Sequence, residues 1–147
     1  MIAVEKQLHV FVKAHRNLER QVGKLTAVSG IGTLTALAIA AKLPVERLRD
    51  AKAAAAHVGV TPSERQSGTS IHGKARICKT GNGSLRRDLY MPAVVAMRHN
   101  AILRTFAERL KEKGKPAKVI VVAVMRKLVV LAFAMLKRDL TEALASA

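Results

Sequence analysis

The sequence predicts an all-α domain, and three observations support this fold class. Half of the 147 residues are hydrophobic, which is enough apolar surface for the core of one domain of ordinary size. Apolar residues recur at helical spacing along most of the chain, and glycine or proline ends most of these stretches. The stretch 59–83 is the exception, because it holds five of the nine glycines, and we expect a loop or a short β-hairpin there.

The first predicted element is a coiled-coil-like helix over residues 1–24. Seven positions alternate at spacings of four and three residues, and His15 is their only polar member: Val4, Leu8, Phe11, His15, Leu18, Val22 and Leu25. This pattern favours pairing with another chain or with an antiparallel neighbour. A single amphipathic helix that docks on its own domain explains the pattern equally well.

Residues 25–137 are predicted to form the body of the domain. A tight turn at Gly30–Gly32 joins the first helix to a second one over 33–43. Asp50 is placed to cap a short alanine-rich helix, and Gly59 is a good carboxyl-terminal stop for that helix. The chain is therefore expected to be helical up to the glycine-rich stretch.

Beyond that stretch, three further helices are predicted. Asn82 or Ser84 can cap the first, which contains Pro92, a residue expected to bend it, and runs to about His99. The second shows one apolar face and ends near Gly114.

The third helix, over residues 117–136, is apolar on nearly all sides, as expected of a central core helix. Arg126 and Lys127 lie at its centre, and two charged side chains would be costly at the middle of a bilayer. We therefore expect no membrane partner. Residues 138–147 are expected to be a frayed tail.

The charge balance is strongly positive, since 26 Lys and Arg face 10 Asp and Glu, for a net charge of +16. A charge of this size argues for a polyanionic partner, and nucleic acid is the usual one. Glu5 and Lys6 stand where an export signal needs apolar residues, and the single cysteine, Cys78, has no disulfide partner. A cytoplasmic location is therefore expected.

The composition also argues against several kinds of nucleic-acid enzyme and binder. The ten acids are dispersed and form no convincing pair for Mg²⁺, so neither a metal site nor a cofactor is expected in this chain. With three Phe, one Tyr and no Trp, a base-stacking platform for single strands is missing. The composition therefore favours binding to the phosphate backbone of a duplex or a structured nucleic acid.

The glycine turn is the first candidate binding site. Gly30, Ile31 and Gly32, with apolar residues on both sides, have the layout of a helix-hairpin-helix element. Glycine permits positive φ and close approach of a phosphate, and the N–H groups at the start of the following helix favour an anion. The alternative is a tight helical turn that binds nothing.

The basic loop is the second candidate. Ser67 lies among hydroxyls, glycines and cations, and the nearby cations are Arg65, Lys74 and Arg76. Attack on a phosphodiester needs an activated hydroxyl and cations at the oxygens that gain charge. Composition alone fits a solvated loop that touches a backbone at least as well, and nothing local selects Ser67 over Ser63 or Ser70.

A second glycine turn opens onto the predicted helix after it. Its candidate phosphate-binding residues are Lys79, Asn82, Arg86 and Arg87. The turn lacks the spacing of a nucleotide P-loop, so ATP binding is not expected. Tyr90 is a nucleophile in principle, but a lone helical tyrosine is more often part of the core.

Six short motifs, spread over most of the chain from about residue 25 to residue 137, resemble those of a known family. They are residues 29–32 (Ser-Gly-Ile-Gly), 56–62 (Ala-His-Val-Gly-Val-Thr-Pro), 66–68 (Gln-Ser-Gly), 76–82 (Arg-Ile-Cys-Lys-Thr-Gly-Asn), 85–86 (Leu-Arg) and 126–128 (Arg-Lys-Leu). In this order they resemble the carboxyl-terminal transposase domain of the bridge-RNA-guided serine transposases of the insertion-sequence 110/116/902 type.

This resemblance implies a DNA recombinase. It implies that Ser67 is a nucleophile that forms a phosphoserine link to DNA, and that Lys79, Asn82 and Arg86 position or neutralise the phosphate. In such proteins a RuvC-like amino-terminal domain holds Mg²⁺ on four carboxylates, and a structured guide RNA pairs with double-stranded DNA. The resemblance also implies several copies on DNA in the bacterial nucleoid. These residues hold no counterpart of the RuvC-like domain, so catalysis by this chain alone is not expected.

Two non-catalytic functions are alternatives to the enzymatic one. The first is a helix-hairpin-helix module that grips DNA or RNA phosphates. The second is a structured-RNA binder similar to a basic ribosomal protein. Substitution of Ser67 separates both from the enzymatic reading, because only that reading requires the hydroxyl.

Overall fold

Seven helices and one pair of two-residue strands form the part of the chain that the computed structural model describes, namely residues 2–63, 76–77 and 80–147. In chain order they are α1 (Ile2–Ala14), α2 (Arg16–Thr26), α3 (Thr33–Lys42), α4 (Ala51–Val58), β1 (Pro62–Ser63), β2 (Arg76–Ile77), α5 (Gly83–His99), α6 (Ala101–Glu112) and α7 (Ala117–Ala145). The all-α prediction is confirmed.

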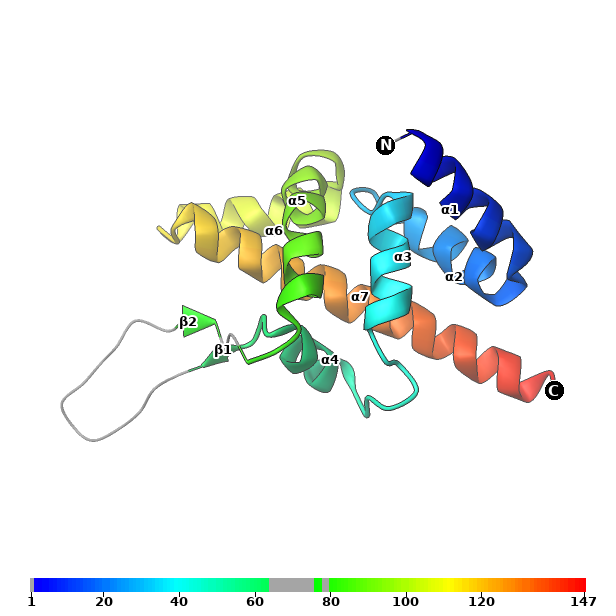
Figure 1. Cartoon of the computed structure of the whole chain (residues 1–147). Helices are drawn as coiled ribbons and strands as arrows, with labels where there is room; N and C mark the ends of the chain where they lie inside the picture. Colours follow the sequence, from blue (N-terminus) through cyan, green and yellow to red (C-terminus); the bar gives the residue numbers. More distant parts are fainter. Residues whose placement is uncertain (1, 64–75, 78–79) are drawn as a thin grey trace.

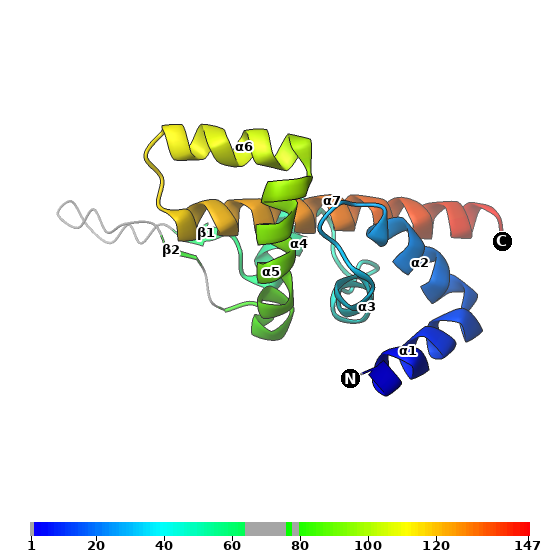
Figure 2. The ribbon, with the colours of Figure 1, turned by 90° about the horizontal axis from the view of Figure 1, so that it is seen from above.

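Helix α7 is the central element of the fold. Helices α2, α4, α5 and α6 all pack along its 29 residues, as the two views in Figures 1 and 2 show. Its buried side chains, such as Val124, Leu128 and Ala132, are fully enclosed because different helices cover different turns. By length and composition alone α7 could also cross a membrane, and half of its most apolar window is buried inside the fold.

The end of α7 differs from the expected frayed tail. The helix continues to Ala145, and Asp139 is only 2% exposed. Its carboxylate lies 2.7 Å from Nζ of Lys24 and 2.9 Å from Nε of Arg20, both on α2. These two cations hold the last turns of α7 in place, which explains why residues beyond 137 remain helical.

The amino-terminal segment also differs from the expected single helix over residues 1–24. The helix breaks at His15, whose backbone is extended (φ −119°, ψ 92°), and α2 turns to pack against α3 and α7. Val22 is therefore buried in the core, whereas Val4 and Phe11 on α1 are more than half exposed. Pairing of the α1 half with another chain stays a prediction.

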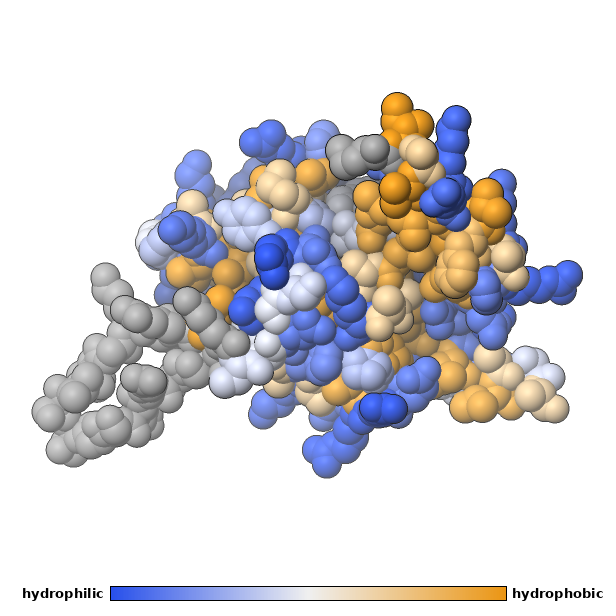
Figure 3. All heavy atoms as spheres, in the orientation of Figure 1, coloured by the Kyte–Doolittle hydropathy of each residue, from blue (hydrophilic) through white to orange (hydrophobic). Residues whose placement is uncertain are grey.

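Local signals for helix ends are confirmed. Asp50 accepts a hydrogen bond from the backbone N–H of Ala53, and Gly59 ends α4 with φ +79°. Of the two candidate caps for α5, Asn82 takes the role, while Pro92 lies buried inside that helix. Figure 3 shows hydrophobic residues gathered over α1 and α3 on the face that it presents, and hydrophilic ones over α5.

Candidate nucleic-acid interface

The two short strands bring together the chain on either side of residues 64–75. They pair antiparallel, with Pro62 opposite Ile77 and Ser63 opposite Arg76. Of the loop or short β-hairpin expected here, the structure describes this antiparallel pair. Ser67, Arg65, Lys74 and Lys79 lie outside the described residues, as does the side chain of Arg76.

The backbone at Gly81 lies directly against the backbone at the end of α4. A Cβ atom at Gly81 would lie 2.5 Å from the carbonyl oxygen of His57 and 2.6 Å from the carbonyl carbon of Val58. Real Cβ atoms do not approach backbone so closely, so only glycine fits here. The N–H of Asn82 donates to the same His57 oxygen at 2.6 Å.

Two residues predicted to bind phosphate have partners within the protein. Oδ1 of Asn82 accepts a hydrogen bond from the N–H of Leu85 at 3.0 Å, which caps α5. Nη1 of Arg86 donates to the carbonyl oxygen of Val58 at 3.1 Å. That carbonyl is one of the last in α4 and has no partner within its own helix, so Arg86 satisfies it. Both residues therefore join the start of α5 to the end of α4.

Helix α3 contacts both α5 and α4 through its last residue, Lys42. Its Nζ donates to Oγ of Ser84 at 2.9 Å and pairs with the carboxylate of Asp88, both on α5. Nε2 of His57 lies 3.1 Å from the backbone oxygen of Lys42. Sequence reasoning missed Lys42, Asp88 and this contact of His57, because the partners lie 15 to 46 residues apart and no local pattern connects them. Helices α3, α4 and α5 thus meet at the base of the basic loop.

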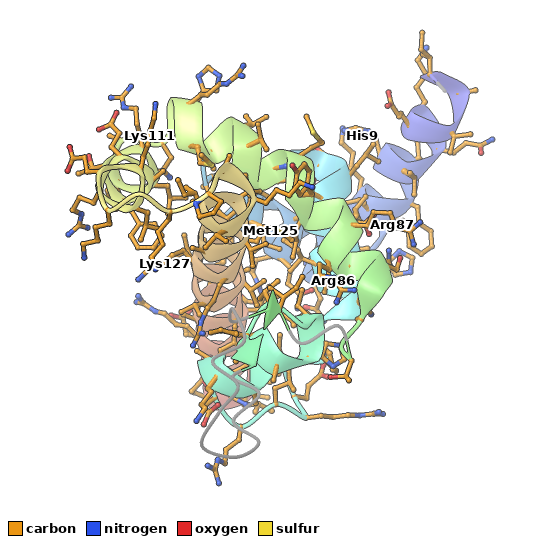
Figure 4. The ribbon with its side chains drawn as sticks, turned by 90° about the vertical axis from the view of Figure 1, so that its left-hand side faces the viewer. His9, Arg86, Arg87, Lys111, Met125 and Lys127 are labelled. Atoms are coloured by element: carbon orange, nitrogen blue, oxygen red, sulfur yellow. The ribbon has the colours of Figure 1, made fainter. Side chains whose placement is uncertain are left out.

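Arg87 differs from its neighbour Arg86. It is exposed and has no hydrogen-bond or ion-pair partner among the described residues. Figure 4 shows both arginines on α5, on the opposite side of α7 from Lys111 and Lys127. Of the predicted phosphate-binding side chains that the structure describes, Arg87 is the one most available to a ligand.

In the glycine turn between α2 and α3, the two glycines have different surroundings. Gly30 has φ +107°, and a Cβ there would lie 2.7 Å from Cβ of Ala96 on α5, so close packing requires this glycine. Ile31 is buried and its N–H donates to the oxygen of Val28 at 3.0 Å, so Ile31 serves packing. The space where a Cβ of Gly32 would lie is open.

The start of α3 is the open part of this turn. The first backbone bond of the helix runs from the N–H of Ala36 to the oxygen of Gly32, and no side chain caps the N–H groups before it. Such N–H groups, with the helix dipole behind them, suit an anion. Within the described ranges, no three His, Cys, Asp or Glu side chains gather in a way that could hold a metal ion.

Comparison with known proteins gives consistent matches. Residues 23–108 match the family described as "Transposase IS116/IS110/IS902 family". The chain is 32% identical over 139 residues to a pilin gene-inverting protein of Moraxella bovis, covering 92% of this chain and 43% of that protein. It is 28% identical over 138 residues to a probable family 20 transposase of Pseudomonas aeruginosa, covering 87% and 39%. An insertion element IS110 protein of Streptomyces coelicolor is 28% identical over 136 residues, covering 92% and 32%. The chain thus spans less than half the length of these relatives.

Proposed function

This chain belongs to the IS116/IS110/IS902 family of transposases, and on that premise we propose that it attacks the DNA backbone through the hydroxyl of Ser67 during transposition. The names of the relatives describe a transposase, an insertion element and the inversion of a pilin gene. All three concern the rearrangement of DNA. Double-stranded DNA is accordingly the proposed substrate.

The observation that carries this proposal is the base of the basic loop. The segment with Ser67 begins after β1, which follows α4, and ends before β2, which precedes α5, and the two strands pair with each other. The close approach of Gly81 to His57 and the bond from Arg86 to Val58 join the start of α5 to the end of α4 beside this pair. Such a joined base supports the positioning of a nucleophile, which catalysis requires.

The proposed step exchanges one phosphate ester for another. The Oγ–P bond to Ser67 forms as the bond between phosphorus and a deoxyribose oxygen breaks. The serine proton ends on the leaving oxygen, so charge and atoms balance. Cations near the phosphate stabilise the oxygens that gain charge, and we assign this role to Arg65, Lys74, Arg76, Lys79 and the exposed Arg87.

The proposed transposition reaction also needs a metal ion, a guide RNA and a second copy of the chain. We assign Mg²⁺ to a RuvC-like domain in a longer or partner protein, as the resemblance of the sequence motifs to the family implies. A structured guide RNA and a second copy of the chain on DNA complete the proposal.

A covalent trapping assay tests the serine assignment. The chain joined to a RuvC-like amino-terminal domain is mixed with guide RNA and nicked DNA, and the adduct is mapped by mass spectrometry. We expect DNA on Ser67, no adduct with Ser67→Ala, and an unchanged yield with the matched control Ser70→Ala. An adduct on Ser63, Ser70 or Tyr90 would overturn the assignment.

A second candidate function is non-catalytic binding through a helix-hairpin-helix element. The open N–H groups at the start of α3 and the free space beside Gly32 favour it. Under this function the chain binds duplex DNA tightly and in a salt-sensitive way, but yields no adduct with any substrate. The same trapping assay, run beside a binding titration, therefore separates the two.

A further inference from the structure

The hairpin of α6 and α7 carries cations that the proposed chemistry does not use. Residues 101–127 contain eight Lys and Arg but only two acids. None of the eight forms an ion pair with a carboxylate in the described part of the chain. By contrast, Asp88 and Asp139 elsewhere are each paired with lysine. The hairpin therefore presents positive charge that the fold itself leaves uncompensated.

Helical spacing divides the exposed residues of α6 into two stripes, because Leu103 and Ala107 face α7 and are buried. The first stripe holds Arg104, Glu108 and Lys111, and Lys115 follows the end of the helix. The second stripe holds Ile102, the half-buried Phe106 and Arg109, and the C-cap residue Lys113 continues it. Glu108 thus falls on the first stripe, whereas Glu112 lies between the two stripes, three residues after Arg109.

Lys127 of α7 joins the second stripe. Its Nζ lies 5.1 Å from the centroid of the Phe106 ring, a distance at which the ring attracts the ammonium group. Figure 4 shows Lys127 and Lys111 on opposite sides of α6, as the two stripes require. We call Arg109, Lys113 and Lys127 the Lys127 face. All three are exposed, and none of them forms an ion pair with a carboxylate in the described part of the chain.

We propose that the Lys127 face binds the phosphate backbone of a nucleic-acid duplex. Arg109 and the C-cap residue Lys113 are four residues apart, about 6 Å at the rise of a helix, which is close to two phosphate steps of about 3.4 Å along the duplex axis. Phe106 holds the Lys127 ammonium in place, so less side-chain freedom is lost on binding. The face offers no exposed aromatic ring to stack on bases, so the contact is independent of sequence.

The hairpin of α6 and α7 lies near the two short strands. In both Figures 1 and 2 the connection between α6 and α7 lies at the same end of the molecule as β1 and β2. A duplex on the Lys127 face would therefore run past the end of the fold from which the basic loop departs. This inference needs no Ser67 chemistry and goes beyond the proposed function.

A salt titration with matched variants tests the proposal. The 147-residue chain is titrated into a fluorescent 20-base-pair DNA duplex and an RNA duplex of the same sequence, over a range of salt concentrations. The test variant carries Arg109→Gln, Lys113→Gln and Lys127→Gln, and the control carries Arg104→Gln, Lys111→Gln and Lys115→Gln. Both lose three charges from the same hairpin, so net charge alone cannot distinguish them.

We expect the test variant to lower the slope of log affinity against log salt by about 2.7 on DNA, if each side chain meets one phosphate. The control should lower it by less than about 1. A drop with only one of the two duplexes identifies which nucleic acid supplies the phosphates. Equal drops in both variants, or no drop in either, would overturn the proposal.

Two additional measurements separate phosphate contact from unfolding and from membrane binding. Circular dichroism checks the helix content of each variant, and if the triple variant unfolds, the double variant Arg109→Gln, Lys113→Gln replaces it, because it leaves the contact with Phe106 intact. Vesicles of phosphatidylcholine and phosphatidylserine test a membrane as the alternative polyanion. Loss of vesicle binding with unchanged nucleic-acid binding would overturn the proposal as well.

Discussion

Lys24 on α2 donates a hydrogen bond to Asp139 on α7 across 115 residues of sequence, with 2.7 Å between Nζ and Oδ1. Arg20, one turn earlier on α2, reaches the same carboxylate at 2.9 Å. This contact joins the amino-terminal segment to the last turns of the central helix. It ties α2, which begins after the break at His15, to the helical end of α7.

Loss of the Asp139 charge should destabilise the fold. Asp139→Asn leaves the neutral side chain buried between two cations, and we expect the free energy of unfolding to fall by about 1–3 kcal/mol. Urea unfolding followed by circular dichroism measures this. Glu142→Gln is the control, because that side chain is exposed and should change stability little. Equal effects of the two substitutions would contradict a special role for Asp139.

The same carboxylate makes part of the stability depend on pH. Burial acts to raise the pKa of Asp139, but the hydrogen bonds and charges of Lys24 and Arg20 outweigh it and hold the pKa below its ordinary value of 3.8. As pH falls, the unfolded chain takes up the proton first, so this stabilisation is lost as pH drops through the lowered pKa. The stability difference between wild type and Asp139→Asn should be constant above about pH 5 and shrink below about pH 4. A difference that grows on acidification would show that the sign is wrong.

Gly81 should not tolerate a side chain. Gly81→Ala places a methyl group against the backbone of His57 and Val58, and we expect a loss of about 1–3 kcal/mol in the free energy of unfolding. Gly23→Ala is the matched control on α2, where a Cβ meets nothing within 4 Å. There the helix should gain about 0.5–1 kcal/mol. Chemical unfolding of both variants tests the contrast, which fails if Gly81→Ala is neutral.

The neighbours Arg86 and Arg87 should behave differently. Arg86→Gln removes the bond to Val58 and should lower the free energy of unfolding by about 1–2 kcal/mol. Arg87→Gln should leave stability unchanged but lower the salt slope of DNA binding by about 0.9. Thermal unfolding and a salt titration on each variant provide the test. If Arg87→Gln changes stability and Arg86→Gln changes only binding, the two roles are reversed.

Much of the fold follows from short-range patterns in the sequence. Asp50 and Gly59 define the two ends of α4, and the apolar run after Pro116 defines the core helix, because caps and helical periodicity act over a few residues. Charge alone indicated a polyanionic partner. The motif order identified the family that the comparisons then established.

The tertiary structure decided what depends on residues far apart in the chain. It separated the buried Val22 from the exposed Val4 within one heptad pattern, because α2 meets α3 and α7 whereas α1 lies at the edge. It also showed that Gly30 and Gly81 must be glycine, because the backbone there lies close to α5 and α4, respectively. Arg86 donates a hydrogen bond to the last residue of α4, whereas the side chain of Arg87 is exposed. Periodicity reports which residues share a face, but burial and hydrogen bonding depend on what that face meets, and only the folded chain supplies the partner.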